Sequence, residues 1–241
     1  MTHLIRLLLI GLVLSLMGLA EASTSATKTV RIQTNEVTME NAPAWLTQTR
    51  VESVASRIAN KLEWSIRRVP VKWYYNTDDF DKAHSLGPFA TAVTVVQGDR
   101  ITIHLGPSVT DAEFDETFGH ELVHVVVAQK YKSAIPKWLE EGLANHIAKH
   151  QKIDYKWLLR QAFPPDVREL AHPMRGTVGG IRYRYKASQA LAEMLDKKCD
   201  LENLVRLSVQ RNMEDYIKTY CEISDLNAAF KAWVKQQAAK L

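Results

Sequence analysis

Residues 110–144 read TDAEFDETFGHELVHVVVAQKYKSAIPKWLEEGLA, and this stretch decides the fold. Thr110 followed three residues later by Glu113 is a capping-box signature, which predicts that a helix begins here. The apolar residues that follow predict that this helix runs to about Lys130. A further helix is predicted from Pro136, because proline suits the first position of a helix. The chain should therefore form two neighbouring helices joined by a short loop.

His120 and His124 form an HExxH pattern inside the first predicted helix. Side chains four residues apart lie on one face of a helix, so both imidazoles can bind the same ion. Glu121 is turned by about 100° from His120 and lies beside the open position of such an ion. Zinc with three protein ligands keeps a fourth position for water and lowers the pKa of that water towards neutrality. We therefore expect Glu121 to accept the proton that the water releases.

Two histidines need a third ligand to make a catalytic zinc site. The second predicted helix, which should end near residue 150, and the segment after it supply the candidates Glu140, Glu141, His146, His150 and His172. Glu140 and Glu141 point about 100° apart on a helix, so only one of them can face the histidines. The residues alone leave this choice open.

The segment Pro136–Ala144, PKWLEEGLA, resembles the W-L-x-E-G-[LF]-A segment of gluzincin metallopeptidases, in particular the bacterial peptidase MA-like domains. In that family the glutamate directly before the glycine is the third zinc ligand, which the resemblance places at Glu141. Sixteen residues separate His124 from Glu141, a spacing that fits two antiparallel helices. The resemblance further implies a zincin-like fold, a Zn2+ cofactor and peptide-bond hydrolysis. Glu140 would then form a hydrogen bond or face solvent.

Enzymes of this kind commonly carry a tyrosine or histidine that donates a hydrogen bond to the oxyanion of the reaction intermediate. The resemblance makes Tyr185 and Tyr183 the candidates, with a weaker sequence match at Tyr185–Ser188. The alternative for either tyrosine is a structural role in the core or at the surface, near the start of a helix.

The aminopeptidase branch of the gluzincins has a glutamate in a G-x-M-E-N segment on the strand before the zinc helix. Here the corresponding strand reads ITIHLGP over residues 101–107 and has no acidic residue. This departure argues against an aminopeptidase. An exposed edge strand at this place could instead pair with an extended substrate backbone, which suits an endopeptidase. His104 in this strand is expected to be structural.

The rest of the chain predicts an α+β fold, with a small, mixed and mainly antiparallel sheet, the HExxH helix and a helical C-terminal part from about residue 151. Strands are predicted at 29–38 and 69–75, and a hairpin at 91–96 and 101–105. Helices are predicted at 45–64, 186–198, 201–212, 214–220 and 224–240.

The N-terminus has the pattern of a secretory signal peptide at residues 1–22, with an apolar run at Leu7–Leu19 followed by small residues. An uncleaved membrane anchor is the alternative, although the run is shorter than the roughly 20 residues that span a bilayer. The mature protein is expected in the periplasm or outside the cell, with no membrane span after cleavage. It would comprise a lead-in and strand at 23–44 and the metallopeptidase domain at 45–241.

The chain has 241 residues, with 31 Lys and Arg against 27 Asp and Glu, and a formal net charge of +4. Charged residues make up 24% of the chain and hydrophobic residues 46%, which excludes a disordered or multi-spanning membrane protein. Its only two cysteines cannot build a four-cysteine zinc site. Cys199 and Cys221 are expected to pair in an oxidising compartment, and two buried reduced thiols are the alternative.

The segment Arg182–Lys186 alternates basic and aromatic residues, which could indicate nucleic-acid binding. A secreted protein rarely meets nucleic acid and the net charge is modest, so we expect no nucleic-acid partner. These charges better suit the rim of a peptidase cleft or contact with an anionic cell envelope.

Taken together, the sequence predicts a secreted or periplasmic zinc peptidase, most simply an endopeptidase, with a peptide or protein substrate. The metal ligands are His120, His124 and Glu141, while Glu121 carries protons and a tyrosine stabilises the oxyanion. Two alternatives are a catalytically silent, peptidase-like factor for envelope binding or assembly, and a zinc amidase acting on a non-protein substrate. The oligomeric state is not predicted.

Overall fold

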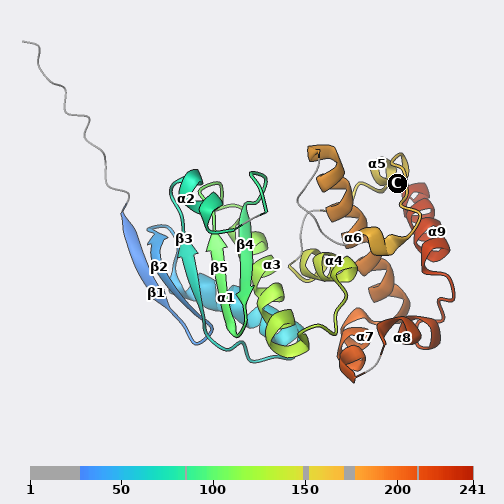
Figure 1. Ribbon diagram of the computed structural model, residues 1–241, viewed down its shortest axis with the longest axis horizontal. Helices are drawn as coiled ribbons and strands as arrows, with labels where there is room; N and C mark the ends of the chain where they lie inside the picture. The colour runs from blue at the N-terminus through green and yellow to red at the C-terminus, as the bar shows by residue number, and fades with distance from the viewer. Residues whose placement is uncertain (1–27, 85, 149–151, 171–176, 211, 241) are drawn as a thin grey trace, which may run out of the picture.

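The computed structural model describes residues 28–84, 86–148, 152–170, 177–210 and 212–240. Within them, a five-stranded sheet with its helices forms one part of the molecule, and helices alone form the C-terminal part (Figure 1). The expectation of a small mixed sheet followed by a helical C-terminal part is therefore confirmed. The predicted signal peptide and the start of the lead-in lie outside the described residues.

The strands are β1 (Thr29–Gln33), β2 (Val37–Pro43), β3 (Val69–Trp73), β4 (Ala92–Gln97) and β5 (Arg100–Leu105). They lie in the order β1-β2-β3-β5-β4. The pairs β1–β2 and β4–β5 are antiparallel, whereas β2–β3 and β3–β5 are parallel. The prediction of a mainly antiparallel sheet is wrong, because a helix between β2 and β3 returns the chain so that both strands run the same way.

The edge strand of the sheet beside the HExxH helix is β4. β5 pairs with both β3 and β4 and is therefore an interior strand. The expectation of an exposed edge at residues 101–107 is wrong, because the hairpin places its first strand outermost. The unpaired side available to an extended peptide accordingly belongs to β4.

The single strand predicted over residues 29–38 is a hairpin of two strands. Its turn forms at Thr34, whose hydroxyl oxygen accepts hydrogen bonds from the backbone N–H groups of Glu36 and Val37. The backbone N–H of Thr34 also donates to the carbonyl of Val37 at 2.9 Å. A threonine that bonds its own backbone in this way favours a turn over a continuous strand.

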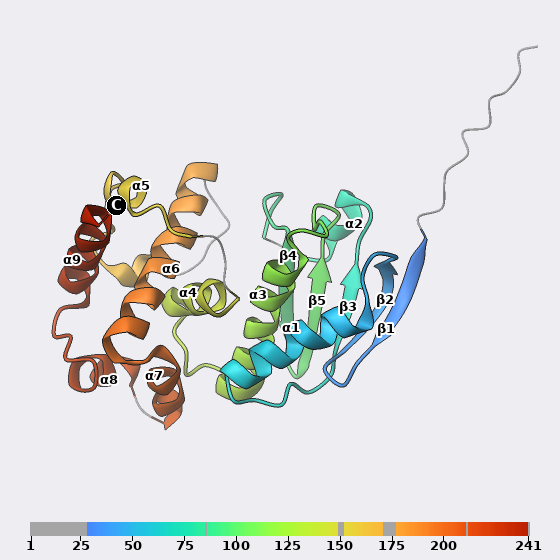
Figure 2. The ribbon, with the colours of Figure 1, turned by 180° about the vertical axis from the view of Figure 1, so that it is seen from behind.

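Helices α1 (Gln48–Lys61) and α3 (Phe114–Val126) cover one face of the sheet (Figure 2). Thr47 caps α1 by accepting a hydrogen bond from the backbone N–H of Arg50. The apolar stripe of α1 is buried, and its members are Val51, Val54, Ala55 and Ile58. The helix predicted over 45–64 is confirmed, with shorter ends.

Helix α3 begins at Phe114, later than the start predicted near Thr110. Thr110 donates its hydroxyl to the carboxylate of Glu113 at 2.8 Å, and this contact between two side chains leaves the backbone of the first turn uncapped. The helix continues directly into a π-helical turn at Val127–Tyr131. Its predicted end near Lys130 is confirmed.

Helix α4 (Lys137–Ile147) begins directly after Pro136, which is its N-cap and not its first helical residue. Both views show α4 between α3 and α6 (Figures 1 and 2). Helix α6 (Val178–Cys199) starts well before the predicted start at Lys186, because the hydroxyl of Thr177 caps its first turn.

The remaining helices are α2 (Thr77–Lys82), α5 (Tyr155–Leu159), α7 (Leu201–Leu207), α8 (Met213–Thr219) and α9 (Leu226–Ala239). Short 3-10 helices lie at Val167–Leu170 and Ser208–Gln210. α2 and α5 are not among the predicted helices, because their few residues show no helical periodicity. Within the described part of the chain, no helix has the length and apolar character that a membrane span requires.

A disulfide joins Cys199, the last residue of α6, to Cys221, which follows α8. The two Cα atoms are 4.8 Å apart. The expected pairing is therefore confirmed, and the bridge ties the C-terminal end of α6 to the last helices of the chain.

Candidate metal centre

His120, His124 and Glu141 lie together where α3 meets α4. One ligand atom from each falls within 4.8 Å of the others. The Nε2 atoms of His120 and His124 are 3.1 Å apart, and the carboxylate oxygens of Glu141 lie 3.4 and 3.5 Å from these two nitrogens. This group could hold a metal ion, as the sequence predicts.

Apolar packing orients the two histidines. They are one turn apart on α3, and the side chains around them are completely buried, namely Leu122, Val123, Val125 and Val126. Burying these residues fixes the rotation of α3 about its axis. His120 and His124 consequently face α4, where Glu141 lies in the first turns of the helix.

The donor set and its spacing fit zinc. In a tetrahedral site with zinc–ligand distances of about 2.0–2.1 Å, two ligand atoms lie roughly 3.3–3.4 Å apart. The two imidazole nitrogens are 3.1 Å apart, and they lie 3.4 and 3.5 Å from different oxygens of the Glu141 carboxylate, so each of these contacts is close to that spacing. Two imidazole nitrogens and one carboxylate also form a ligand set typical of catalytic zinc, with a fourth position left for water or substrate.

Glu140 contacts the other nitrogen of His124. Its carboxylate accepts a hydrogen bond from Nδ1 of His124 at 2.9 Å and forms an ion pair with Lys137. Burial raises the pKa of Glu140, but the hydrogen bond from His124 and the Lys137 ammonium outweigh burial and hold that pKa below its ordinary value. With its hydrogen on Nδ1, His124 presents the lone pair of Nε2 to the ligand site. Of the two roles expected for Glu140, hydrogen bonding is the one that the structure has.

The carboxylates around His124 attract positive charge. Burial lowers the pKa of this histidine, but the charge of Glu141 and the hydrogen bond to Glu140 outweigh burial and raise the pKa to about 9. A site with two imidazoles and several carboxylates in a poorly solvated place is stabilised by a cation. A divalent metal ion supplies that charge to all three candidate ligands at once.

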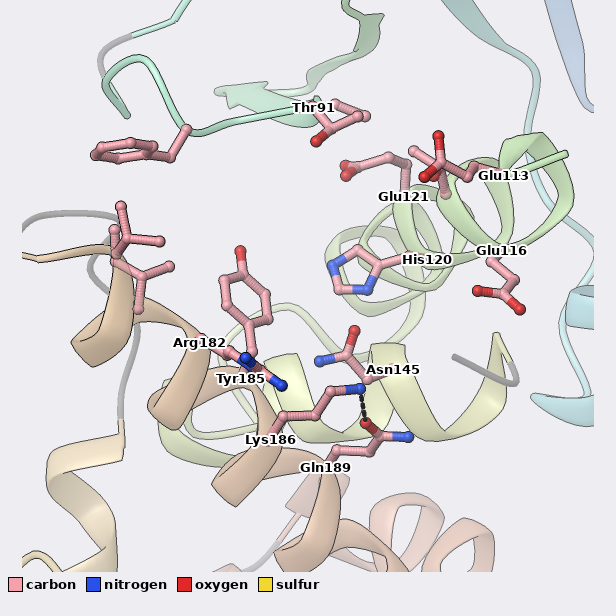
Figure 3. A pocket seen from close by; sticks show the side chains of 15 residues that line it. Thr91, Glu113, Glu116, His120, Glu121, Asn145, Arg182, Tyr185, Lys186 and Gln189 are labelled. Atoms are coloured by element: carbon pink, nitrogen blue, oxygen red, sulfur yellow. Dashed lines mark hydrogen bonds between the residues drawn. The ribbon is translucent and has the colours of Figure 1, made fainter. Parts of the chain in front are cut away.

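Glu121 lines a cavity beside His120 and is only 5% exposed (Figure 3). The hydroxyl of Thr94 on β4 lies 2.7 Å from Oε2 of Glu121 and 3.1 Å from its carbonyl oxygen. This contact holds the carboxylate in one orientation next to the metal centre. Thr94 was not identified from the sequence, although it is the one polar residue in the apolar run Ala92–Val96.

The cavity has a volume of about 430 Å³ and lies between two walls. One wall belongs to α3 and the chain leading into β4, and it includes His120 and Glu121. The other wall is one face of α6, which contributes Tyr185 and Lys186. Residues distant in sequence therefore share one space next to the candidate ligands.

Tyr185 is the tyrosine that faces the metal centre. Its ring centroid lies 6.5 Å from that of His120, and its hydroxyl points into the cavity (Figure 3). Burial and the charges of Glu141 and Glu121 raise the pKa of Tyr185, so its hydroxyl keeps its proton and can donate a hydrogen bond. Tyr183 packs against the hydrophobic core and does not line this cavity, and burial raises its pKa to about 12.

Gly142 allows α6 to approach α4 closely enough to place Tyr185 here. A Cβ atom at position 142 would lie 2.1 Å from the carbonyl oxygen of Ser188 and 2.7 Å from its carbonyl carbon. These are backbone atoms, which cannot move aside as a flexible side chain can. The glycine of the segment Pro136–Ala144 and Ser188 thus meet where the two helices cross.

Lys186 and Asn145 complete the polar lining of the cavity. The ammonium of Lys186 donates a hydrogen bond to Gln189 at 3.2 Å, and burial and the charge of Arg182 lower its pKa (Figure 3). Asn145 is buried on α4, one turn after Glu141. Lys186 belongs to the basic segment expected at the rim of a cleft, whereas Asn145 was not predicted, although its spacing of four residues from Glu141 places both on one face of a helix.

Neither His104, which was expected to be structural, nor His146, which was a candidate ligand, belongs to the described cluster. His104 lies on the sheet face away from α3, with Nδ1 2.8 Å from the hydroxyl oxygen of Tyr74, and burial lowers its pKa to about 4. His146 lies 3.3 Å from the carboxylate of Asp196. His150 and His172 fall outside the described residues.

The chain matches no protein-family model, and no curated protein matches it. The geometry of the metal centre and the cavity is therefore what bears on function.

Proposed function

We propose that the protein is a zinc-dependent peptidase of the gluzincin type, with a zincin-like fold, that acts in the periplasm or outside the cell. The observation that carries this proposal is the convergence of His120, His124 and Glu141 at separations that suit zinc, with Glu121 beside them in an open cavity. His120 and His124 would bind the ion through Nε2, and Glu141 through its carboxylate.

Different groups would carry out different steps of the hydrolysis. When bound, zinc supplies a Lewis acid that polarises the scissile carbonyl and lowers the pKa of water. Glu121, held by Thr94, takes a proton from the attacking water at its carboxylate and later passes it to the leaving amine. Proton transfer of this kind typically contributes about 10²–10⁴-fold to the rate.

Tyr185 would stabilise the charge that develops on the carbonyl oxygen. Its hydroxyl points into the cavity, and its raised pKa keeps it a donor at neutral pH. A donor already in place before reaction stabilises a developing oxyanion without further reorganisation. Tyr185 is therefore preferred to Tyr183 for this role.

An extended peptide fits the surroundings of the site. β4 is the edge strand, and its first residue, Ala92, lines the cavity next to the candidate ligands. A peptide that pairs with this edge would pass over the metal centre. Such binding along the backbone suits an endopeptidase.

Two other functions remain open to test. A silent peptidase-like factor for envelope binding or assembly would have no chemical need for Glu121, which here is buried and held by Thr94. A zinc amidase acting on a non-protein substrate would use the same residues as a peptidase. Peptide cleavage distinguishes both alternatives from the proposal.

The test compares purified wild-type protein with the Glu121→Gln variant. We expect both to bind one zinc ion, the wild type to cleave members of a peptide library, and a chelator to stop this cleavage. Glu121→Gln should lower the rate by at least about 10²-fold. Cleavage at the wild-type rate by the variant would overturn the mechanism, and zinc binding without cleavage of any peptide would favour the alternatives.

A further inference from the structure

The side chains that α6 contributes to the cavity change from apolar to polar along the helix. They are Val178, Ile181, Arg182, Tyr185, Lys186 and Gln189. Their spacing of three and four residues makes them one face of the helix. The face is apolar at the start of α6 and polar from Arg182 onward, so the cavity has an apolar end and a polar end.

Phe89 lines the same cavity from the opposite wall, in the segment that leads into β4. It lies two residues before Thr91, which lines that wall (Figure 3). Phe89 is 49% exposed and Val178 is 62% exposed, while Ile181 is nearly buried. Single exposed apolar side chains are common on protein surfaces. Two large ones that line one cavity from separate parts of the chain indicate a surface that binds an apolar group.

The distance from Tyr185 indicates which part of a substrate this end would meet. Val178 lies seven residues before Tyr185, which corresponds to about 10 Å along the axis of α6. An extended peptide advances by roughly 3.3 Å per residue. For a peptide that runs along α6, the apolar end is therefore about three residues away from a bond placed at the metal centre.

Among the described residues, the opposite end of the cavity offers no comparable apolar contact (Figure 3). It is lined by Lys186 and Gln189 from α6, and by Glu113 and Glu116 from the other wall. An apolar side chain placed there would bury charged groups without giving them hydrogen-bond partners. The protein should therefore prefer an apolar substrate residue on only one side of the scissile bond.

We propose that Phe89 and Val178 bind a bulky apolar side chain of the substrate, about three residues from the bond that is cut, with Ile181 beneath it. This inference rests on the proposed peptidase function and specifies its substrate class. The protein would select extended peptides with Leu, Ile, Phe or a similar residue at that position.

The experiment uses purified protein loaded with zinc and two peptide series that differ only at one position, Leu or Phe against Ser. We expect the wild type to prefer the apolar peptides by about 10- to 100-fold in kcat/KM. Phe89→Ala should lower this preference about tenfold, and Val178→Thr, which keeps the branched shape, by a few-fold. Leu207→Ala removes a similarly exposed apolar side chain outside the cavity and should keep the wild-type preference.

The outcomes separate the two proposals. Cleavage without an apolar preference, or with a preference that Phe89→Ala and Val178→Thr leave unchanged, would overturn this inference and leave the peptidase function intact. Equal loss of preference in Leu207→Ala would also overturn it, because the effect would not come from the cavity. If the zinc-loaded wild type cleaves no peptide, both proposals fail.

Discussion

The two walls of the cavity differ in how they are built and in what each would do. The wall of α3, joined by α4, carries the metal ligands within one stretch of sequence. The wall of α6 carries Tyr185 and the apolar end, and it is brought in by packing against α4 at Gly142. The ligand wall should therefore govern metal binding, while the α6 wall should govern reaction rate and substrate choice. Substitutions in the two walls can therefore be told apart, because those in the ligand wall should change metal affinity and those in the α6 wall should change the rate or the substrate preference.

The largest effect on the α6 wall is expected from Tyr185→Phe. Loss of the hydroxyl should lower kcat by about 10²–10³-fold, because a single donor to an oxyanion contributes about 2.7–4 kcal/mol. Zinc content and thermal stability should stay close to those of the wild type. Tyr183→Phe is the matched control, since that hydroxyl lies outside the cavity. Equal losses in the two variants would contradict the role given to Tyr185.

On the ligand wall, Glu140→Gln should have a smaller effect, and this effect should fall on the affinity for zinc and not on kcat. The amide replaces a charged acceptor for Nδ1 of His124, which should weaken zinc binding by about 10- to 100-fold. At saturating zinc, kcat should recover most of its wild-type value. Competition with a zinc chelator measures the affinity. A fall in kcat that excess zinc does not restore would show that Glu140 acts in the reaction itself.

The smallest effect is expected from a substitution at Gly142, where α4 and α6 are in contact. Gly142→Ala should destabilise the protein by about 1–3 kcal/mol through overpacking against Ser188. The control is Gly119→Ala on α3, whose Cβ would come close to the end of the flexible Arg57 side chain, at 3.0 Å, and would make ordinary van der Waals contacts at 3.6 Å with the side chains of Ala148 and Val54. Alanine favours a helix by up to about 1 kcal/mol over glycine, so the control should be neutral or slightly stabilised. Chemical denaturation measures both, and equal stabilities would contradict the close packing.

The difference between the ligand wall, which one stretch of sequence forms, and the α6 wall, which packing brings in, also explains what could be predicted from the sequence. The HExxH spacing and the apolar residues around it are local, so the two histidines and their helix follow from helix geometry. The hairpin at 91–105 is also local and was found. The split of the first strand depends on hydrogen bonds made by Thr34, which the alternation of apolar residues does not reveal.

The parts that could not be predicted depend on contacts between distant segments. Thr94 reaches Glu121 because β4 packs against α3, and the position of β4 in the strand order is not encoded in any single segment. Packing on α4 sets the rotation of α6 about its axis. This rotation places Tyr185, and not Tyr183, in the cavity. Lys186 reaches the cavity through the same packing of α6, and Phe89 reaches it from the segment before β4, which belongs to no motif.

The most direct test of the account is the position of zinc in a crystal structure of the purified protein, located by anomalous scattering at the zinc edge. We expect one site, with Nε2 of His120, Nε2 of His124 and an oxygen of Glu141 each about 2.0–2.2 Å from the ion. A zinc ion bound by Glu140 in place of Glu141, or an ion at another place in the protein, would contradict it. So would the absence of zinc from protein crystallised with a stoichiometric amount of the metal.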